Sequence, residues 1–337
     1  MMSVAQPAAL RCLLATLLWV ASGQAWAADL PPPLVLEATI PLPHTGGRID
    51  HMAVDLRRGR LFVAELGNGT LDVIDIAGRR VFQRVSGFKD PQGVGYSPMA
   101  DIVSVASAGD GSVRLFRGED LSPAGAVDLG DDADNVRVDS RSGQVFVGYG
   151  KGGLAVVDPP SHSVVSRAKL PAHPEGFGID AAARRAYVNV PDAHQIAVVD
   201  LGTGLQTATW QAPGLRSSYP MALDETQGLI ATAFWDPARL VLLDTANGAV
   251  KASIETCGDA DDVFFDAKRR RIYVSCGEGL VDVLQGDTAG YHLLAHIPTH
   301  SGARTSLFVP ELDRLFVAAR AGLTGSDAAL LVFRPGP

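Results

Sequence analysis

Cysteine is scarce in this sequence of 337 residues, which contains Cys12, Cys257 and Cys276. None of them belongs to a C-x-x-C or C-x-x-C-H motif, so the sequence gives no support to a thioredoxin-like redox centre or to covalent haem attachment. The hydrolase and nucleotide-binding signatures G-x-S-x-G, H-E-x-x-H and the P-loop are also missing. The common signatures of these enzymes therefore assign no chemistry to the chain.

Basic residues are in short supply as well. The 29 Lys and Arg face 37 Asp and Glu, which gives a net charge of −8. Binding to nucleic acid requires basic side chains that displace counterions from the phosphates. We therefore expect no nucleic-acid partner. Apolar residues make up 47% of the chain, and this favours a globular protein with a substantial core.

Long apolar runs are missing except near the N-terminus. Residues 1–27 have the pattern of a signal peptide: Arg11, then the apolar run 12–21, then the A-x-A cleavage signal at 25–27. The run is too short to span a bilayer, and no later segment is a candidate membrane span. We expect an exported protein, periplasmic in a Gram-negative cell or otherwise secreted, whose mature part is residues 28–337. Losing Arg11 leaves 28 basic residues against 37 acidic ones, a net charge of −9.

Two cysteines remain in the predicted mature chain, Cys257 and Cys276. An even number of cysteines in an exported protein fits one disulfide bond, because disulfides persist in oxidising compartments. Closing a loop of about twenty residues would stabilise the fold by roughly 3 kcal/mol in the chain-entropy model. The alternative is a pair of buried thiols.

Internal repeats dominate the rest of the sequence. A short strand-like motif with an aromatic residue before valine recurs five times: RLFVA (60–64), QVFVG (144–148), RAYVN (185–189), RIYVS (271–275) and RLFVA (314–318). The segments 102–106 and 229–233 occupy the same place in two weaker units. A preceding apolar strand ends at equivalent positions 41 to 44 residues apart: Asp55, Tyr96, Asp139, Asp180, Asp224, Asp266 and Pro310. The chain therefore consists of seven repeat units.

Each unit contains four predicted strands separated by Gly, Asn and Asp turns, with no helical periodicity between them. A four-stranded repeat of this length is typical of a β-propeller blade. The seventh unit ends one strand short, and a spare apolar strand, residues 34–42, precedes the first unit. The sequence therefore predicts an all-β fold, a single seven-bladed β-propeller of antiparallel blades, with the N-terminal strand closing the last blade.

The repeated motif and the TLDVID-type strand that follows it resemble the YVTN-repeat, YncE-like seven-bladed propellers exported by bacteria. The resemblance covers all seven units. No unit carries the YVTN tetrad itself, but five carry its aromatic-valine core. The resemblance implies the propeller fold. It also implies a range of functions, since such propellers include binding proteins, lactonase-like enzymes and subunits of redox enzymes.

Chemistry is expected at the mouth of the central channel, where the loops that lead into the seven innermost strands converge. Aligned on the strand ends, four units have an acidic residue at one position: Asp50, Asp134, Glu175 and Asp261. Four further candidates share the next position: His51, Gln92, Asn135 and Asp262. The remaining candidates are Arg48 and His173 at an earlier position, and Arg304 in the seventh unit. The third and sixth units lie nearly opposite in a ring of seven, so their acidic loops would face each other.

Converging carboxylates and imidazoles could bind a divalent metal, calcium through the oxygen ligands or zinc through His51 and His173. The predicted metal ligands are Asp134, Glu175, Asp261 and Asp262. Arg48 and Arg304 could hold a carboxylate or phosphate by bidentate hydrogen bonds. The alternative is purely structural, since Asp and Asn are also favoured in turns, and no EF-hand spacing is present.

Three functions remain open at this point. The first is an exported binding or scaffold protein, expected to be monomeric, that presents the channel mouth to a small molecule or a protein partner. The second is a metal-dependent hydrolase of the lactonase kind that uses Asp134, Glu175, Asp261 and the two histidines. The third is an accessory subunit of a periplasmic redox enzyme, in which any cofactor would belong to a partner. No catalytic residue is assigned from the sequence.

Overall fold

Short runs of β-branched and aromatic residues, separated by glycine and aspartate turns, fold into narrow antiparallel sheets. The computed structural model describes residues 1–2, 31–322 and 327–337. The predicted signal peptide, apart from its first two residues, lies outside the described part of the chain. Within the described part, no helix is long and apolar enough to cross a membrane. Residues Pro32–Pro337 form one compact unit.

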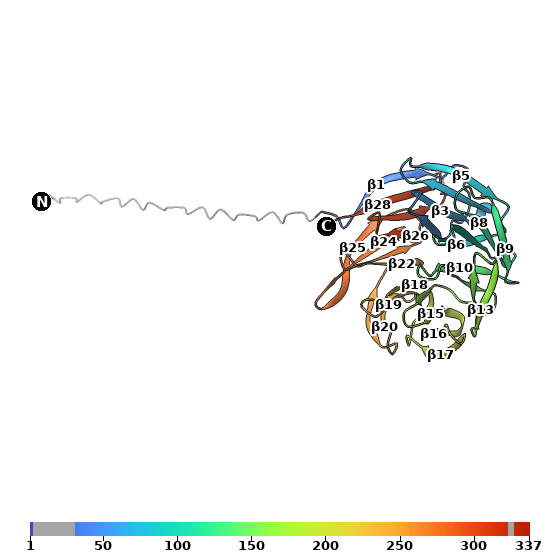
Figure 1. Cartoon of the computed structure of the whole chain (residues 1–337). Helices are drawn as coiled ribbons and strands as arrows, with labels where there is room; N and C mark the ends of the chain where they lie inside the picture. The colour runs from blue at the N-terminus through green and yellow to red at the C-terminus, as the bar shows by residue number, and fades with distance from the viewer. Residues whose placement is uncertain (3–30, 323–326) are drawn as a thin grey trace. The chain divides into compact units, whose positions relative to one another are not determined.

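The strands of this unit form seven four-stranded antiparallel sheets, the blades, arranged in a ring (Figure 1). Blade 1 contains β2 (Met52–Asp55), β3 (Arg60–Glu65), β4 (Thr70–Asp75) and β5 (Arg80–Ser86). Blade 2 contains β6 (Pro91–Ser97), β7 (Ile102–Ser107), β8 (Ser112–Arg117) and β9 (Pro123–Asp128). Blade 3 contains β10 (Ala133–Val138), β11 (Val145–Tyr149), β12 (Gly153–Asp158) and β13 (Ser163–Lys169).

The remaining blades follow the same order from the inside of the ring outwards. Blade 4 contains β14 (Phe177–Asp180), β15 (Arg185–Val190), β16 (Gln195–Asp200) and β17 (Leu205–Trp210). Blade 5 contains β18 (Arg216–Asp224), β19 (Leu229–Asp236), β20 (Ala238–Asp244) and β21 (Val250–Glu255). Blade 6 contains β22 (Ala260–Asp266), β23 (Arg271–Cys276), β24 (Leu280–Asp287) and β25 (Gly290–Pro298). Blade 7 contains β26 (Ser306–Val309), β27 (Arg314–Ala319), β28 (Ala329–Pro335) and β1 (Leu34–Pro41). Two 3-10 turns, η1 (Leu66–Asn68) and η2 (Pro191–Ala193), cap hairpins in blades 1 and 4.

The last blade is closed by the N-terminal strand, as the sequence predicted. β1 pairs with β28 from Leu34 opposite Pro335 to Pro41 opposite Ala329 (blue beside red in Figure 1). This pairing joins the two ends of the repeat array and covers an edge of β28 that would otherwise be open. The seven-bladed propeller fold is confirmed.

Burial explains why the second strand of each unit carries the clearest motif. β23 is buried along its whole length, because neighbouring blades cover both faces of the sheet. After Arg271, whose guanidinium donates to Gln285 and to the Gly336 carbonyl, its residues are apolar, aromatic or small. The outermost strand β25 alternates between exposed and half-buried residues, because it lies at the rim. The strong β-forming run thus marks the middle of each blade.

The disulfide prediction is also confirmed. Cys257 and Cys276 are bonded, their Cα atoms lie 5.9 Å apart, and both residues are buried. The bond connects the residue just before the mouth loop Gly258–Asp262 to the end of β23. It therefore fixes one side of the loop that carries two of the predicted site residues.

Candidate functional site

The loops that lead into the inner strands converge on a small polar recess of about 30 Å³, here called the mouth recess. Its lining includes eight of the predicted residues: Arg48, Asp50, His51, Gln92, Asp134, Asn135, Glu175 and Asp261. Hydrogen bonds between the inner ends of neighbouring blades hold these loops together. The His51 backbone N–H donates to the Gln92 carbonyl at 3.3 Å, and that of Gly176 donates to the Tyr219 carbonyl at 2.8 Å. A volume of this size can hold a water molecule or a metal ion.

One side of the mouth recess carries a group of potential metal ligands. One donor atom each from Asp134, His173 and Glu175 lies within 4.8 Å of the other two. His173 Nε2 is 3.6 Å from Asp134 Oδ2, while His173 Nδ1 lies 2.6 Å from the Gly150 carbonyl oxygen. An imidazole that is oriented from behind by a backbone carbonyl is the usual arrangement of a metal-ligating histidine. We call these three residues the ligand cluster.

Asn135 supplies a second, independent observation at the same place. The residue is 4% exposed and lines the mouth recess, yet its side-chain oxygen Oδ1 has no hydrogen-bond partner in the described part of the chain. Burying an amide oxygen without a partner costs about 1–3 kcal/mol. A ligand that offers a positive charge or a donor would remove this cost.

Two of the predicted metal ligands lie outside the ligand cluster. Asp261 Oδ2 pairs with Arg304 Nε at 3.2 Å. Asp262 Oδ2 accepts the Ser306 backbone N–H at 2.7 Å, and its Oδ1 lies 3.9 Å from His51 Nδ1. Both carboxyl groups therefore serve contacts between blades 6, 7 and 1. His173, which was predicted only as a ligand-binding residue, takes their place beside Asp134.

The predicted arginines are paired at the rim. Arg48 Nη2 lies 2.6 Å from Asp50 Oδ2 and 3.5 Å from Gln92 Oε1. Arg304 Nη1 donates to Asp259 Oδ1 at 2.6 Å, and its guanidinium lies 5.6 Å from the ring of Trp235. These contacts occupy some of the N–H donors with which Arg48 and Arg304 were predicted to bind a carboxylate or phosphate.

Burial shifts the pKa values of the acidic groups upwards. Desolvation raises the pKa of Asp50 and of Asp261 to about 6, against the opposing effect of Arg48 and Arg304. For Glu175, desolvation and the nearby Asp134 carboxylate raise the pKa to about 8. These carboxyl groups therefore ionise less readily than free ones, and a cation bound beside them would favour their charged forms.

The two histidines have opposite electrostatic environments. Desolvation, aided by Arg137, lowers the pKa of His51, so this imidazole is neutral at pH 7. Desolvation also acts on His173, but hydrogen bonds to Asp134 and to the Gly150 carbonyl outweigh it and raise the pKa to about 9. His173 is therefore positioned by acceptors, whereas His51 is the freer base.

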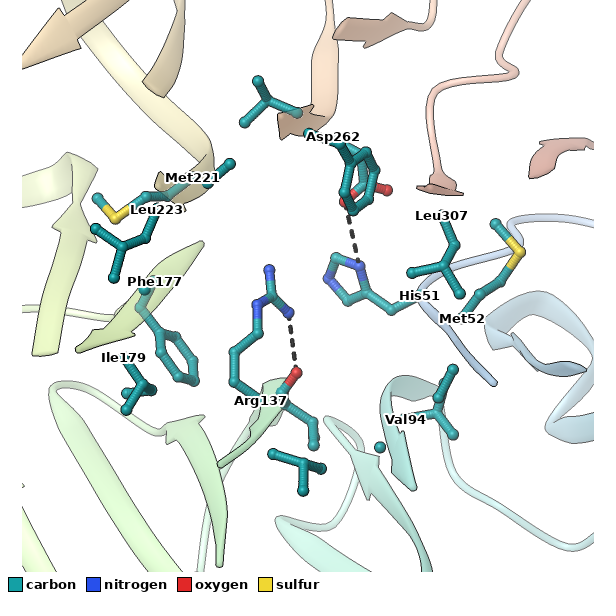
Figure 2. A pocket seen from close by; sticks show the side chains of 18 of the residues that line it. His51, Met52, Val94, Arg137, Phe177, Ile179, Met221, Leu223, Asp262 and Leu307 are labelled. Atoms are coloured by element: carbon teal, nitrogen blue, oxygen red, sulfur yellow. Dashed lines mark hydrogen bonds and ion pairs between the residues drawn. The ribbon is translucent and has the colours of Figure 1, made fainter. Parts of the chain in front are cut away.

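Next to the mouth recess lies a larger cavity of about 510 Å³ within the channel, here called the channel cavity (Figure 2). His51 and Arg137 line both spaces, and apolar side chains line most of the rest of the channel cavity. Arg137 was not among the sequence predictions. It could have been found, because it is the one arginine or lysine in the predicted innermost strands.

Comparisons with known proteins support the fold. A search with protein-family models and a search of curated proteins found no match. Among solved structures, a chain from the crystal structure of a mitotic checkpoint complex has a TM-score of 0.78 and 13% identity, over 97% of this chain and 99% of that chain. A chain of hydrazine synthase from Kuenenia stuttgartiensis has a TM-score of 0.72 and 14% identity, over 86% of this chain and 97% of that chain. At such low identities these similarities show the β-propeller fold, and function has to be argued from the site.

Proposed function

We propose that this chain is an exported β-propeller binding protein whose mouth recess holds a divalent cation and presents it to a small ligand or a protein partner. The observation that supports this most directly is the ligand cluster beside the buried, unpartnered Asn135 Oδ1. The ligand cluster and the Asn135 oxygen are thus two independent features that would be stabilised by a cation in the mouth recess.

The donor set favours zinc over calcium. Calcium takes six or more oxygen ligands, whereas zinc accepts a mixture of imidazole and carboxylate ligands. His173 supplies a nitrogen, and Asp134 and Glu175 supply oxygens, which leaves a coordination position for a ligand. The Asn135 oxygen can bind that ligand or a metal-bound water.

Two further features support export, which is part of the same proposal. The Cys257–Cys276 disulfide suits an oxidising compartment, in agreement with the signal-peptide pattern of residues 1–27. The resemblance to YVTN-repeat, YncE-like proteins supports an exported propeller. A net charge of −8 disfavours nucleic acid as the partner.

Metal analysis of protein purified without chelator tests the proposal. We expect about one equivalent of zinc per chain, lost on dialysis against chelator and regained on titration. The Asp134→Asn variant should weaken zinc binding by more than the roughly 10–100-fold typical of removing an outer-shell partner. The matched control is Asp131→Asn, an exposed aspartate in the same loop, which should bind zinc normally. Failure of the wild-type protein to bind zinc would refute the proposal.

A second candidate function, lactonase-like hydrolysis, is supported by His51. This neutral imidazole lines the mouth recess together with Asp134 and Glu175, and a zinc ion there would polarise a lactone carbonyl. His51 could then act as general base toward a water molecule, an effect worth roughly 100- to 10,000-fold in rate. We expect zinc-loaded protein to hydrolyse simple γ- and δ-lactones, with His51→Gln losing turnover but retaining zinc. If zinc-loaded protein does not hydrolyse these lactones, the lactonase function is refuted and the binding function is unaffected.

A further inference from the structure

The channel cavity has no part in the cation site, and it has the size of a small-molecule site. Its volume of about 510 Å³ lies within the roughly 300–1,000 Å³ that is typical of ligand pockets. Its lining extends along the inner strands from His51 and Asp262 beside the mouth recess to Glu225, which follows β18 at the opposite end. The cavity therefore occupies the channel on the far side of the polar layer.

Most of the wall is apolar. Phe177, Ile179, Met221 and Leu223 line one side, and Leu307 with neighbouring side chains lines the other (Figure 2). Protein interiors are otherwise close-packed, and apolar cavities hold water poorly. A wall of this kind suits the hydrocarbon part of a ligand.

One cationic group projects into this apolar space. The Arg137 side chain extends from β10 into the middle of the channel (Figure 2). Its guanidinium donates a hydrogen bond to the carbonyl oxygen of its own neighbour, Val136, at 2.9 Å, and lies 5.6 Å from the Phe177 ring. Among the described residues, no carboxylate lies within 4.0 Å of it, the limit for an ion pair.

An unpaired guanidinium in such surroundings is costly. Desolvation lowers the pKa of Arg137, and the more distant Asp262 and Asp134 only partly oppose it. Buried charges are normally paired, because removing a charge from water without a partner costs several kilocalories per mole. A carboxylate that accepts two parallel hydrogen bonds from the planar guanidinium would supply the missing partner.

We propose that the channel cavity binds a single-chain carboxylate, with its head group on Arg137 and its hydrocarbon tail against Phe177, Met221 and Leu307. A monoanion fits best, because Arg137 is the one arginine or lysine among the lining residues. At the far end, Glu225 is already paired with Arg141 at 2.9 Å. A second anionic group would therefore meet a neutralised ion pair there. This site does not depend on a cation in the mouth recess.

Calorimetric titration with decanoate, in the presence of chelator, tests this site. Decanol is the matched probe, because it has the same tail without the charge. We expect decanoate to bind the wild-type protein roughly 10- to 100-fold more tightly than decanol, the range for a charge-assisted hydrogen-bond pair. Absence of decanoate binding, or equal affinity for the two probes, would overturn the proposal.

Substitutions separate a ligand-binding arginine from a structural one. Arg137→Met should reduce decanoate affinity at least roughly tenfold while leaving the melting temperature unchanged or higher, because it removes a half-buried charge that has no ion-pair partner within 4.0 Å among the described residues. Arg137→Lys keeps the charge without the planar fork and should give intermediate affinity. Arg117→Gln, at an exposed arginine on β8, is the matched control and should bind decanoate normally. Unchanged affinity in Arg137→Met would overturn the proposal.

The two sites can be told apart by one further variant. Asp134→Asn should lose zinc and keep decanoate binding, whereas Arg137→Met should lose decanoate binding and keep zinc. Loss of decanoate binding in Asp134→Asn, with the fold intact by circular dichroism, would show that the channel cavity is not an independent site.

Discussion

Gly93 lies on β6 at a point where the inner strands of blades 2 and 3 come very close together. A β-carbon at this position would overlap the carbonyl oxygen of Asp134, and it would come within 2.6 Å of Val136 Cγ2. Only glycine therefore allows β10 to approach closely enough to hold Asp134 at the mouth recess.

Replacing Gly93 by alanine should disturb both stability and the site. We expect Gly93→Ala to lower the free energy of unfolding by about 1–3 kcal/mol, the usual cost of overpacking, and to weaken zinc binding by displacing Asp134. Denaturant unfolding and zinc titration measure the two effects. Gly46→Ala is the control, since a β-carbon there meets nothing closer than 3.8 Å. Equal stability of the two variants would show that the blades have room to separate.

Among single residues, the aligned acidic positions were predictable and their partners were not. Asp50, Asp134, Glu175 and Asp261 all line the mouth recess, as equivalent positions in a ring of repeats should. Which carboxylate joins a metal cluster depends on neighbours from other loops. Arg304 from blade 7 engages Asp261, while a hairpin carbonyl in blade 3 orients His173. Residues that contact each other between loops in this way have no regular spacing in the sequence.

At the scale of elements, adjacent blades are joined by repeated ionic clamps at the turns after the inner strands. In blade 1, Arg58 contacts Asp55 at 2.7 Å and Asp101 of blade 2 through two hydrogen bonds of 2.7 and 2.8 Å. In blade 6, Arg269 makes the corresponding contacts with Asp266 and Asp313. The sequence carries a trace of these clamps, since an Asp three residues before an Arg occurs in both turns.

The clamp predicts a defined pH dependence of stability. Hydrogen bonds from Arg58 lower the pKa of Asp101 from 3.8 to about 2. A depressed carboxyl pKa stabilises the folded state above the unfolded-state pKa, and this contribution disappears as the pH falls from about 4 to about 2. We expect Asp101→Asn to lower the melting temperature by about 2 °C at pH 7, the effect of roughly 1 kcal/mol.

Melting curves of wild-type protein and Asp101→Asn between pH 7 and pH 2 measure the pH dependence of this contribution to stability. The difference in melting temperature should shrink below pH 4. Asp192→Asn, at an exposed residue in η2, should show no comparable difference at any pH. A gap between wild type and Asp101→Asn that persists at pH 2 would contradict the electrostatic origin of the clamp.

For the molecule as a whole, the fold could be predicted from the sequence because the same strand pattern occurs in each of the seven units. The 41–44 residue period, the missing last strand and the spare strand at residues 34–42 together required a closed ring of seven, and β1 beside β28 closes it. The channel cavity could not be predicted in this way. Its volume depends on how far the inner strands lie from the ring axis and on the direction of side chains such as Arg137, neither of which appears in the repeat pattern.

We propose that blades 3 and 4 together hold a cation at the channel mouth. Anomalous diffraction from crystals grown with zinc, recorded on both sides of the zinc absorption edge, tests it most directly. We expect a zinc peak bonded to Asp134, His173 and Glu175, within about 2.0–2.2 Å of their donor atoms. A zinc-containing crystal with no peak at these three residues would contradict it.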